Sequence, residues 1–394
     1  MAPFYSPKAA LFKAFPKMRD LSKQVNQTME NAEKELSKRE LRGCDTSFPR
    51  ARHAEAEWRI NCTNDYEGAV YAVEQLKNSL EISDPLDALE QDDEGSFAPG
   101  TGVWFIKLDR STDQLLARQW PWPRPSTFLE RINGPIRMVT YLQDLCWSDV
   151  ERCGRDNRKE LNLAVSVIVR LIYNGGQAGY LSGPGFVPVL ERFIRDWQDP
   201  DSGFFGMTYM VENGRTITMP DLSLTFHMVR YAPHLVRWWP SLIDTLLAIR
   251  ESTYPQGWLD KSGMTDHNNY DVVELFQRGW NKMLPSQRCQ AAFHIKEMLN
   301  WCLENSVDDD GILANPDKGD PIPESYYFAA AFLDTIGFFD SSKKFWTNDN
   351  LQSPDSRKRG MIAKLKRFNQ DFTVIDNTLE RLGVNHRPWS NAIL

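Results

Sequence analysis

Three loops of similar composition recur along the chain at a nearly constant interval. They read QDDEGSF (91–97), QDPDSGFF (198–205) and VDDDGIL (307–313), and each has an acidic cluster, a glycine and then an apolar or aromatic residue. The intervals are 107 and about 109 residues. Such a period is typical of stacked or circularly arranged units. In each unit, Asp and Gly would make a tight turn and the next residue would pack between layers. The alternative is that acidic turns recur by chance.

Helical segments occupy most of the chain around these loops. Leu161–Tyr173 is apolar on nearly all sides, so other elements should enclose it. Residues 1–16 are expected to be irregular, and residues 82–126 to be rich in loops. Gly206–Met219, which contains Asn213-Gly214, predicts a β-hairpin. The predicted helices are at about 17–41, 66–81, 127–147, 159–173, 186–197, 221–231, 240–250, 270–283, 286–305 and 324–338.

An all-α fold with an inner and an outer layer of helices accounts for these features. Two hairpins of about 50 residues in each period predict an (α/α)6-type barrel or toroid, with a small β-hairpin in one loop. We expect residues 1–65 to form an N-terminal extension and a helix that packs on the ring. Residues 66–394 are expected to form the α/α barrel domain.

Composition argues against several classes of protein. The formal net charge is −7, and the one basic run, at 357–367, is short, so we expect no nucleic-acid partner. The longest apolar run is too short for a membrane span, so no integral membrane segment is expected. Six scattered cysteines and the lack of an apolar signal segment favour a reducing, cytoplasmic location. The oligomeric state stays open.

Several segments resemble known helical-ring proteins. ERFIRDWQDPDSGFFG (191–206) is similar to the Gln/Gly/aromatic loops of triterpene cyclases and related α/α-ring proteins. QWPWPRPSTFLERINGP, QDPDSGFFG, DLSLTFHMVRY and DHNNYDVVELFQRGW resemble a family that includes fungal non-standard class I terpene cyclases, which form humulene from farnesyl diphosphate. This resemblance spans roughly residues 119–340. It implies an (α/α) barrel, loss of diphosphate assisted by Mg²⁺, and cyclisation of the farnesyl cation.

The chain also departs from the usual cyclase motifs. It has no DDxxD on a predicted helix, no Asn/Ser/Glu triad at the standard spacing, and no Asp-x-Asp-Asp signature of protonating cyclases. Candidate ligands of a metal therefore have to be inferred from local chemistry.

The segment 266–278 is the strongest candidate for chemistry. On a helix that begins near Asn269, Asp271, Glu274 and Arg278 would share one face. Mg²⁺ prefers oxygen ligands, and a metal ion with an Arg would stabilise the departing diphosphate. We therefore predict Asp271 and Asn269 as catalytic and Arg278 as a substrate contact. The alternative is a capped helix with a Glu274–Arg278 salt bridge. The predicted Mg²⁺ ligands are Asp266, Asn268, Asp271 and Glu274.

Two further polar groups are candidates. Asp221 and His227 are predicted to be catalytic, because a helix would bring both near Ser223; the alternative is a helix that Asp221 caps, with a histidine whose hydrogen bonds are satisfied. Arg131 and Arg137 flank a Gly-Pro helix break and are predicted to bind diphosphate oxygens. The alternative there is a kinked outer helix with surface arginines.

Aromatic side chains are predicted to line the cavity. They make up 12% of the chain, with 13 Trp, which is more than a single core needs. Each aromatic face stabilises a cation by about 0.5–2 kcal/mol. Aromatics at helical spacing also pack in ordinary cores, which is the alternative. The predicted substrate contacts are Phe226, Phe276, Trp280, Trp301, Tyr326 and Tyr327.

The favoured interpretation is an Mg²⁺-dependent sesquiterpene cyclase that ionises farnesyl diphosphate and closes a medium ring such as humulene. The alternative is a carbohydrate-active enzyme, either a glycoside hydrolase or a polysaccharide lyase, on the same kind of toroid. Its acidic pair would come from the candidate carboxylates, and tryptophans would stack on sugar rings. A non-catalytic scaffold is a third interpretation, and it predicts a polar, solvent-filled groove in place of a closed apolar cavity.

Overall fold

The structure is a computed structural model in which the chain is mostly helical, with one small sheet. It describes residues 5–81, 91–98, 100–117, 124–174, 181, 183–211, 214–314, 320–351, 355–368 and 373–384, without the side chains of residues 113 and 373. The helices are α1 (Pro7–Ala14), α2 (Pro16–Leu41), α3 (Ser47–Cys62), α4 (Tyr66–Glu81), α5 (Trp104–Ala117), η1 (Thr127–Ile132), α6 (Pro135–Leu145), α7 (Val150–Cys153), α8 (Arg158–Asn174), α9 (Phe186–Trp197), α10 (Leu222–Tyr231), η4 (Pro233–Leu235), α11 (Trp239–Ala248), α12 (Asp266–Gly279), η5 (Trp280–Lys282), α13 (Pro285–Trp301), η6 (Cys302–Ser306), α14 (Ile322–Thr335), η7 (Ser341–Lys343), α15 (Asp355–Leu365) and α16 (Thr373–Arg381).

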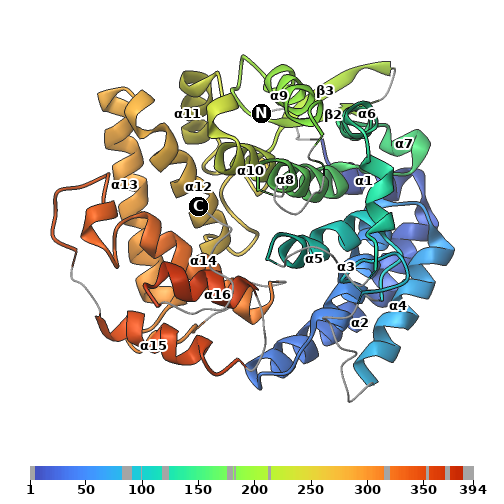
Figure 1. The fold of residues 1–394 in the computed structure, drawn as a ribbon, viewed down its shortest axis with the longest axis horizontal. Helices are drawn as coiled ribbons and strands as arrows, with labels where there is room; N and C mark the ends of the chain where they lie inside the picture. The colour runs from blue at the N-terminus through green and yellow to red at the C-terminus, as the bar shows by residue number, and fades with distance from the viewer. Residues whose placement is uncertain are drawn as a thin grey trace.

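The helices follow one another around the molecule. In Figure 1 the chain runs from the lower right, in blue, across the top, in green and yellow, to the lower left, in red. Helix α5 contacts α8, α8 contacts α10, α10 contacts α12, and α12 contacts α14. Helix α14 also contacts α2, which contacts α3, and α3 contacts α5. This series of contacts therefore returns to the helix from which it started.

The three recurring loops adopt closely related turns. Their glycines, Gly95, Gly203 and Gly311, are 108 residues apart and have φ values of +77°, +71° and +73°. In the first and third loops, Asp92 and Asp308 accept hydrogen bonds from the backbone N–H groups two and four residues later. Positive φ is a conformation that glycine adopts without steric cost, which explains why glycine stands at each turn.

Each of these turns is also fixed against later parts of the chain. A Cβ on Gly95, Gly203 or Gly311 would lie 2.2 Å from a backbone atom of residue 125, 242 or 357 respectively. The backbone N–H two residues after each glycine donates to a hydroxyl on the helix that follows: Ser111 on α5 at 2.8 Å, Thr225 on α10 at 3.0 Å and Tyr326 on α14 at 3.3 Å. The loops thus recur in structure as well as in composition.

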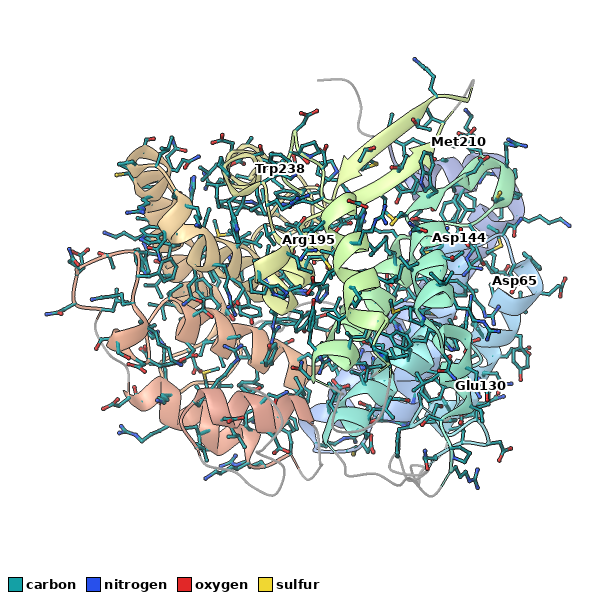
Figure 2. All side chains as sticks on the ribbon, turned by 45° about the horizontal axis from the view of Figure 1, so that its top comes forward. Asp65, Glu130, Asp144, Arg195, Met210 and Trp238 are labelled. Carbon is teal, nitrogen blue, oxygen red and sulfur yellow. The ribbon has the colours of Figure 1, made fainter. Side chains whose placement is uncertain are left out.

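The predicted β-hairpin is confirmed. Strands β2 (Gly206–Met210) and β3 (Thr216–Pro220) pair antiparallel, with Gly206 opposite Pro220. Strand β1 (Trp147–Ser148) adds to β2 in parallel, which gives the order β1-β2-β3. Residue 213 lies outside the described residues. In Figure 2 the hairpin projects from the body of the molecule, with Met210 at the end of β2.

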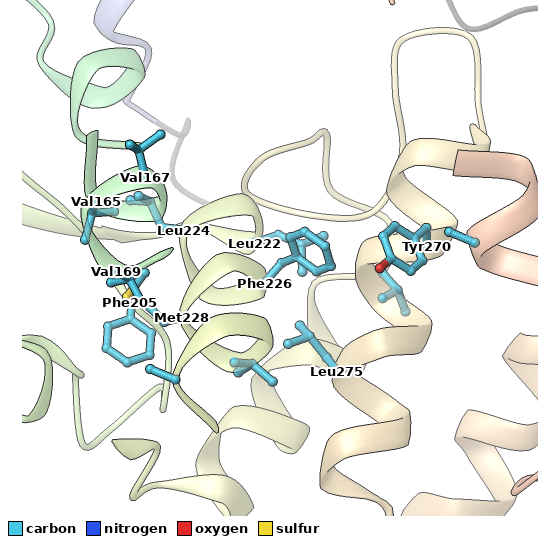
Figure 3. Packing of buried hydrophobic residues seen from close by; sticks show 14 of the residues in the cluster. Val165, Val167, Val169, Phe205, Leu222, Leu224, Phe226, Met228, Tyr270 and Leu275 are labelled. Atoms are coloured by element: carbon cyan, nitrogen blue, oxygen red, sulfur yellow. The ribbon is translucent and has the colours of Figure 1, made fainter. Parts of the chain in front are cut away.

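The apolar segment 161–173 is enclosed, as predicted. Val165, Val167 and Val169 on α8 are at most 1% exposed. Figure 3 shows them beside Leu224 and Met228 of α10 in one core. None of the described helices combines the length and apolar character needed to cross a bilayer.

Several predictions about local structure are wrong. Within the supposedly irregular residues 1–16, α1 forms because the Ser6 hydroxyl accepts from the N–H of Ala9 and because Leu11 is buried. Within the supposedly loop-rich residues 82–126, α5 buries Phe105 and Leu108. The predicted helix 127–147 is divided into η1 and α6, because Pro135 begins a new helix. Helices α3, α15 and α16 were not predicted.

Candidate active site

Polar and aromatic side chains share one face on each of three neighbouring helices. The positions follow the spacing i, i+3, i+4 and i+7, which places side chains on a single helix face. The rings of these faces meet: the ring centroid of Phe226 lies 5.4 Å from that of Tyr270, which lies 6.0 Å from that of Tyr327. Figure 3 shows Phe226 and Tyr270 on neighbouring helices. The positions are Ser223, Phe226, His227 and Arg230 on α10, His267, Tyr270, Asp271 and Glu274 on α12, and Glu324, Tyr327, Phe328 and Ala331 on α14.

Asp271 is the centre of the first group, which we call the carboxyl cluster (Tyr254, His267, Asp271 and Asp320). The Tyr254 hydroxyl donates to Asp271 Oδ2 at 3.0 Å. Asp271 Oδ1 is buried and has no hydrogen-bond partner among the described residues. Since a buried polar atom without a partner costs free energy, this oxygen is a candidate contact for a ligand.

His267 links Asp271 to the loop before α14. Its Nε2 lies 4.0 Å from Asp271 Oδ2, and its Nδ1 lies 3.3 Å from Asp320 Oδ2. Its ring stacks flat on Phe328 at a centroid distance of 4.0 Å. Packing and two carboxylates therefore hold the imidazole in one orientation.

Two carboxyl groups on these helices have strongly raised pKa values. Burial raises the pKa of Asp271 to about 7, against the opposing effects of His267 and of the Tyr254 hydrogen bond. Burial also raises the pKa of Glu324 to about 7, although Arg110 opposes the shift. Carboxyl groups with pKa values near neutrality can exchange protons under physiological conditions.

A groove of about 810 Å³ between α2 and α3 reaches this region. Val25, Met29 and Ile60 line part of it, but most of its lining residues are polar or charged, and Asp320 is one of these. Asp320 belongs to the carboxyl cluster and is paired with His267, so one side chain of the cluster also lines the groove.

His227 lies on α10, and Asp221 is the N-cap of the same helix, which is the role that the alternative interpretation gave it. Asp221 caps the helix by accepting from the N–H of Leu224 at 2.9 Å, and its carboxylate is paired with Arg158. His227 Nδ1 is buried without a partner among the described residues. Burial and the neighbouring Arg230 lower the pKa of His227 to about 3, so this imidazole is neutral at physiological pH.

Four helices each contribute one residue to a second group, which we call the arginine–tyrosine cluster (Arg230, Tyr270, Tyr327 and Arg381). Arg230 Nη2 on α10 donates to Tyr327 Oη on α14 at 2.6 Å. Arg381 Nη2 on α16 donates to Tyr270 Oη on α12 at 3.2 Å. Arg381 also lies 3.7 Å from Asp334, but Lys343 already contacts both oxygens of that carboxylate at 2.8 Å.

Arg230 has no ion pair with a carboxylate within the described parts of the chain. Its guanidinium lies instead among aromatic rings, which attract a cation through their faces. The centroid distances are 5.6 Å to Phe226, 5.2 Å to Tyr231, 5.5 Å to Tyr270 and 5.9 Å to Tyr327. A partly buried cation without a carboxylate is an arrangement that favours an anionic ligand.

The four predicted Mg²⁺ ligands do not converge. Asp266 accepts from Ser306, Asn268 donates to the carbonyl of Trp258 at 2.8 Å, and Glu274 pairs with Arg278 at 3.0 Å. Asp271 faces Tyr254. Helix α12 begins at Asp266, earlier than predicted, so its turn distributes these side chains around the axis. In the part of the chain that the structure describes, no three His, Cys, Asp or Glu side chains form a group that could hold a metal ion.

Among the remaining predicted polar residues, Asn269 lies beside Tyr270 on α12, and the three arginines contact other groups or are exposed. The amide nitrogen of Asn269 is buried without a described partner. Arg278 forms the intrahelical salt bridge that was the alternative for this segment. Arg131 lies 4.9 Å from the ring of Trp104 and 3.9 Å from Glu160, and Arg137 is exposed on α6.

The predicted aromatic contacts divide into two sets. Phe226 and Tyr327 surround Arg230. Phe276 packs on Trp258 in the core, Trp280 packs on Phe345, Trp301 lies at the end of α13, and Tyr326 bonds the third acidic turn.

Sequence reasoning missed six of the eight residues in these clusters: Tyr254, His267, Asp320, Arg230, Tyr270 and Arg381. Arg230 could have been found, because it stands seven residues after Ser223 on the face that also carries His227. Tyr254 and Arg381 carry no such signal, since they come from a loop and from a helix that was not predicted. No protein-family model, no curated protein and no solved structure matches this chain.

Proposed function

We propose that the protein is a sesquiterpene cyclase, which ionises farnesyl diphosphate and cyclises the cation to a medium-ring hydrocarbon such as humulene. The observation that carries the proposal is Arg230, a partly buried guanidinium without a carboxylate partner among the described residues, surrounded by four aromatic rings. The diphosphate would supply the missing anion. The rings would face the allylic cation that its departure creates.

In this proposal the arginine–tyrosine cluster stabilises the diphosphate as it leaves the substrate. Negative charge grows on the diphosphate as its bond to carbon breaks, and fixed positive charge in a poorly solvated site lowers the free energy of that state. Within this cluster, Arg230 on α10 and Arg381 on α16 would supply that positive charge. Asp271 and His267 lie within one helical turn of Tyr270 on α12. From there they would help to bind and orient the substrate.

The predicted Mg²⁺ site does not fit the described side chains, because its four residues contact four different partners. We therefore derive no step through a metal ion, and the requirement for Mg²⁺ stays a prediction from the family resemblance. The cytoplasmic location likewise stays a prediction.

A ring of helical hairpins is the finer architecture that we propose. Two observations support it: the helix contacts that return from α14 through α2 and α3 to α5, and the three turns at intervals of 108 residues. In such a ring the faces that carry both clusters would line the centre.

The experiment is an assay of the purified protein with farnesyl diphosphate, with and without Mg²⁺ and EDTA, followed by gas chromatography. The proposal predicts a hydrocarbon product from the wild type and its loss in Arg230→Leu. Arg288→Leu is the matched control, because Arg288 also lies over an aromatic ring but on α13, at 5.8 Å from Trp280. If farnesyl, geranyl and geranylgeranyl diphosphate all give no hydrocarbon, the proposal is refuted.

A specific observation favours a carbohydrate-active enzyme as the second candidate. Asp271 and Glu324 both have pKa values raised to about 7, as a general acid for glycoside cleavage requires. This candidate predicts oligosaccharide cleavage that Asp271→Asn abolishes. Cleavage without any hydrocarbon formation would replace the cyclase proposal with it.

A further inference from the structure

Tyr327 occupies an electrostatic position unlike that of the other buried tyrosines in the site. Its hydroxyl oxygen accepts from Arg230 Nη2 at 2.6 Å, and the guanidinium of Arg381 lies 5.7 Å from its ring. The ring of Tyr270 lies 6.0 Å from its ring, centroid to centroid. The phenol oxygen thus receives a hydrogen bond from one guanidinium, and a second guanidinium lies over the ring, so this environment favours the phenolate.

The charged groups around Tyr327 leave an excess of positive charge. On α12, Glu274 is paired with Arg278, and its charge also raises the pKa of Arg230 and of Arg381. On α14, Asp334 is paired with Lys343 and lies 3.7 Å from Arg381. On α10, Tyr231 faces Arg230, and the neutral His227 stacks on Tyr231 at 5.8 Å. Arg230 and Arg381 therefore outnumber the carboxylates left to balance them.

The two tyrosines of the cluster respond in opposite directions. Burial alone would raise the pKa of Tyr327, but Arg230 and Arg381 lower it below the ordinary value of 10. Burial raises the pKa of Tyr270, and the negative charge of Tyr327 raises it further. Tyr270 is therefore the tyrosine of the pair that holds its proton more tightly, and Tyr327 is the one that ionises more readily.

We propose that Tyr327 is a catalytic residue, whose phenolate accepts the proton that ends the cyclisation; this inference rests on the proposed function. The proton leaves a carbon beside the cationic centre, and the C–H electron pair becomes the second bond of an alkene. The phenolate oxygen forms an O–H bond, and the phenol returns the proton to water after the product leaves. The step needs no further reactant. The N–H groups of Arg230 that do not bond Tyr327 would hold the diphosphate.

The first test is an ultraviolet absorbance titration of tyrosine ionisation in the whole protein, which needs no substrate. The chain has 12 tyrosines. We expect one of them to ionise at lower pH than the rest, and this early phase to disappear in Tyr327→Phe. Tyr209→Phe is the control, because burial and Asp156 raise the pKa of Tyr209 and keep it out of the early phase. No early phase in the wild type, or an early phase that persists in Tyr327→Phe, overturns the proposal.

The second test separates loss of diphosphate from loss of the proton. With farnesyl diphosphate, Tyr327→Phe should release inorganic diphosphate at a rate within about tenfold of the wild type, while hydrocarbon falls by about a hundredfold, as expected when a general base is removed. Water would trap the cation as an alcohol. An unchanged ratio of hydrocarbon to diphosphate overturns the role of Tyr327. No release of diphosphate by the wild type overturns the proposed function instead, so the two failures are distinguishable.

Discussion

Asp271→Asn should make the protein more stable above neutral pH. Asp271 is fully buried, and its pKa is raised from 3.8 to about 7 in the folded protein. Folding therefore favours the protonated, neutral carboxyl. Above pH 7 the folded protein has to bury a carboxylate that the unfolded chain exposes to water. A neutral amide of similar shape removes this cost and can still accept the hydrogen bond of Tyr254.

The size of the effect follows from the shift. A change of about 3 pKa units corresponds to about 4 kcal/mol, at about 1.4 kcal/mol per unit. Because the pKa of this acid rises on folding, the free energy of unfolding of the wild type decreases between pH 4 and 7. Above that range the decrease is constant. The advantage of Asp271→Asn should therefore be small at pH 4, grow by up to about 1.4 kcal/mol per pH unit, and level off above pH 7.

The assay is urea unfolding of the wild type and the variant at a series of pH values. About 4 kcal/mol also corresponds to a rise in Tm of about 5 °C, given an unfolding entropy of about 2.1 cal/mol/K per residue. Asp144→Asn is the control, because Asp144 is exposed on α6 and should show no such dependence on pH. An Asp271→Asn variant whose stability follows the wild type at every pH would refute the argument that burial holds this carboxyl neutral.

Two further predictions concern the turns and the candidate site. Gly203→Ala should lower the free energy of unfolding by about 3 kcal/mol or more. The new Cβ would lie 2.2 Å from a backbone atom, and alanine would have to adopt a positive φ. Gly214→Ala, at a positive φ with open space around it, should cost only about 1–2 kcal/mol, and equal costs in urea unfolding would argue against a packed turn. Arg230→Leu should reduce turnover of farnesyl diphosphate on the order of a hundredfold, measured against Arg288→Leu; equal rates would remove Arg230 from the site.

Much of the fold could be predicted from the sequence, because apolar periodicity and turn chemistry are local signals. Leu161–Tyr173 is apolar all round and is enclosed, and the Asn-Gly segment marked the hairpin. The regions that were mispredicted lack such signals. Helix α1 buries only Ala10 and Leu11, so its stability comes from a cap and from its contacts with other helices.

The candidate site was harder to predict, because it depends on which helix faces meet. The sequence places Asp266, Asn268, Asp271 and Glu274 within nine residues, yet the helix turns them toward different neighbours. The arginine–tyrosine cluster has the opposite property. Its four residues are scattered from position 230 to position 381, and only tertiary packing brings them together.

The central claim is that Arg230 and its aromatic surroundings bind a diphosphate. Isothermal titration calorimetry with inorganic diphosphate tests this most directly, because it needs neither turnover nor knowledge of the product. The account predicts saturable binding to the wild type and to Arg288→Leu, and at least a hundredfold weaker binding to Arg230→Leu. Equal binding by all three proteins, or no heat of binding to the wild type, would contradict it.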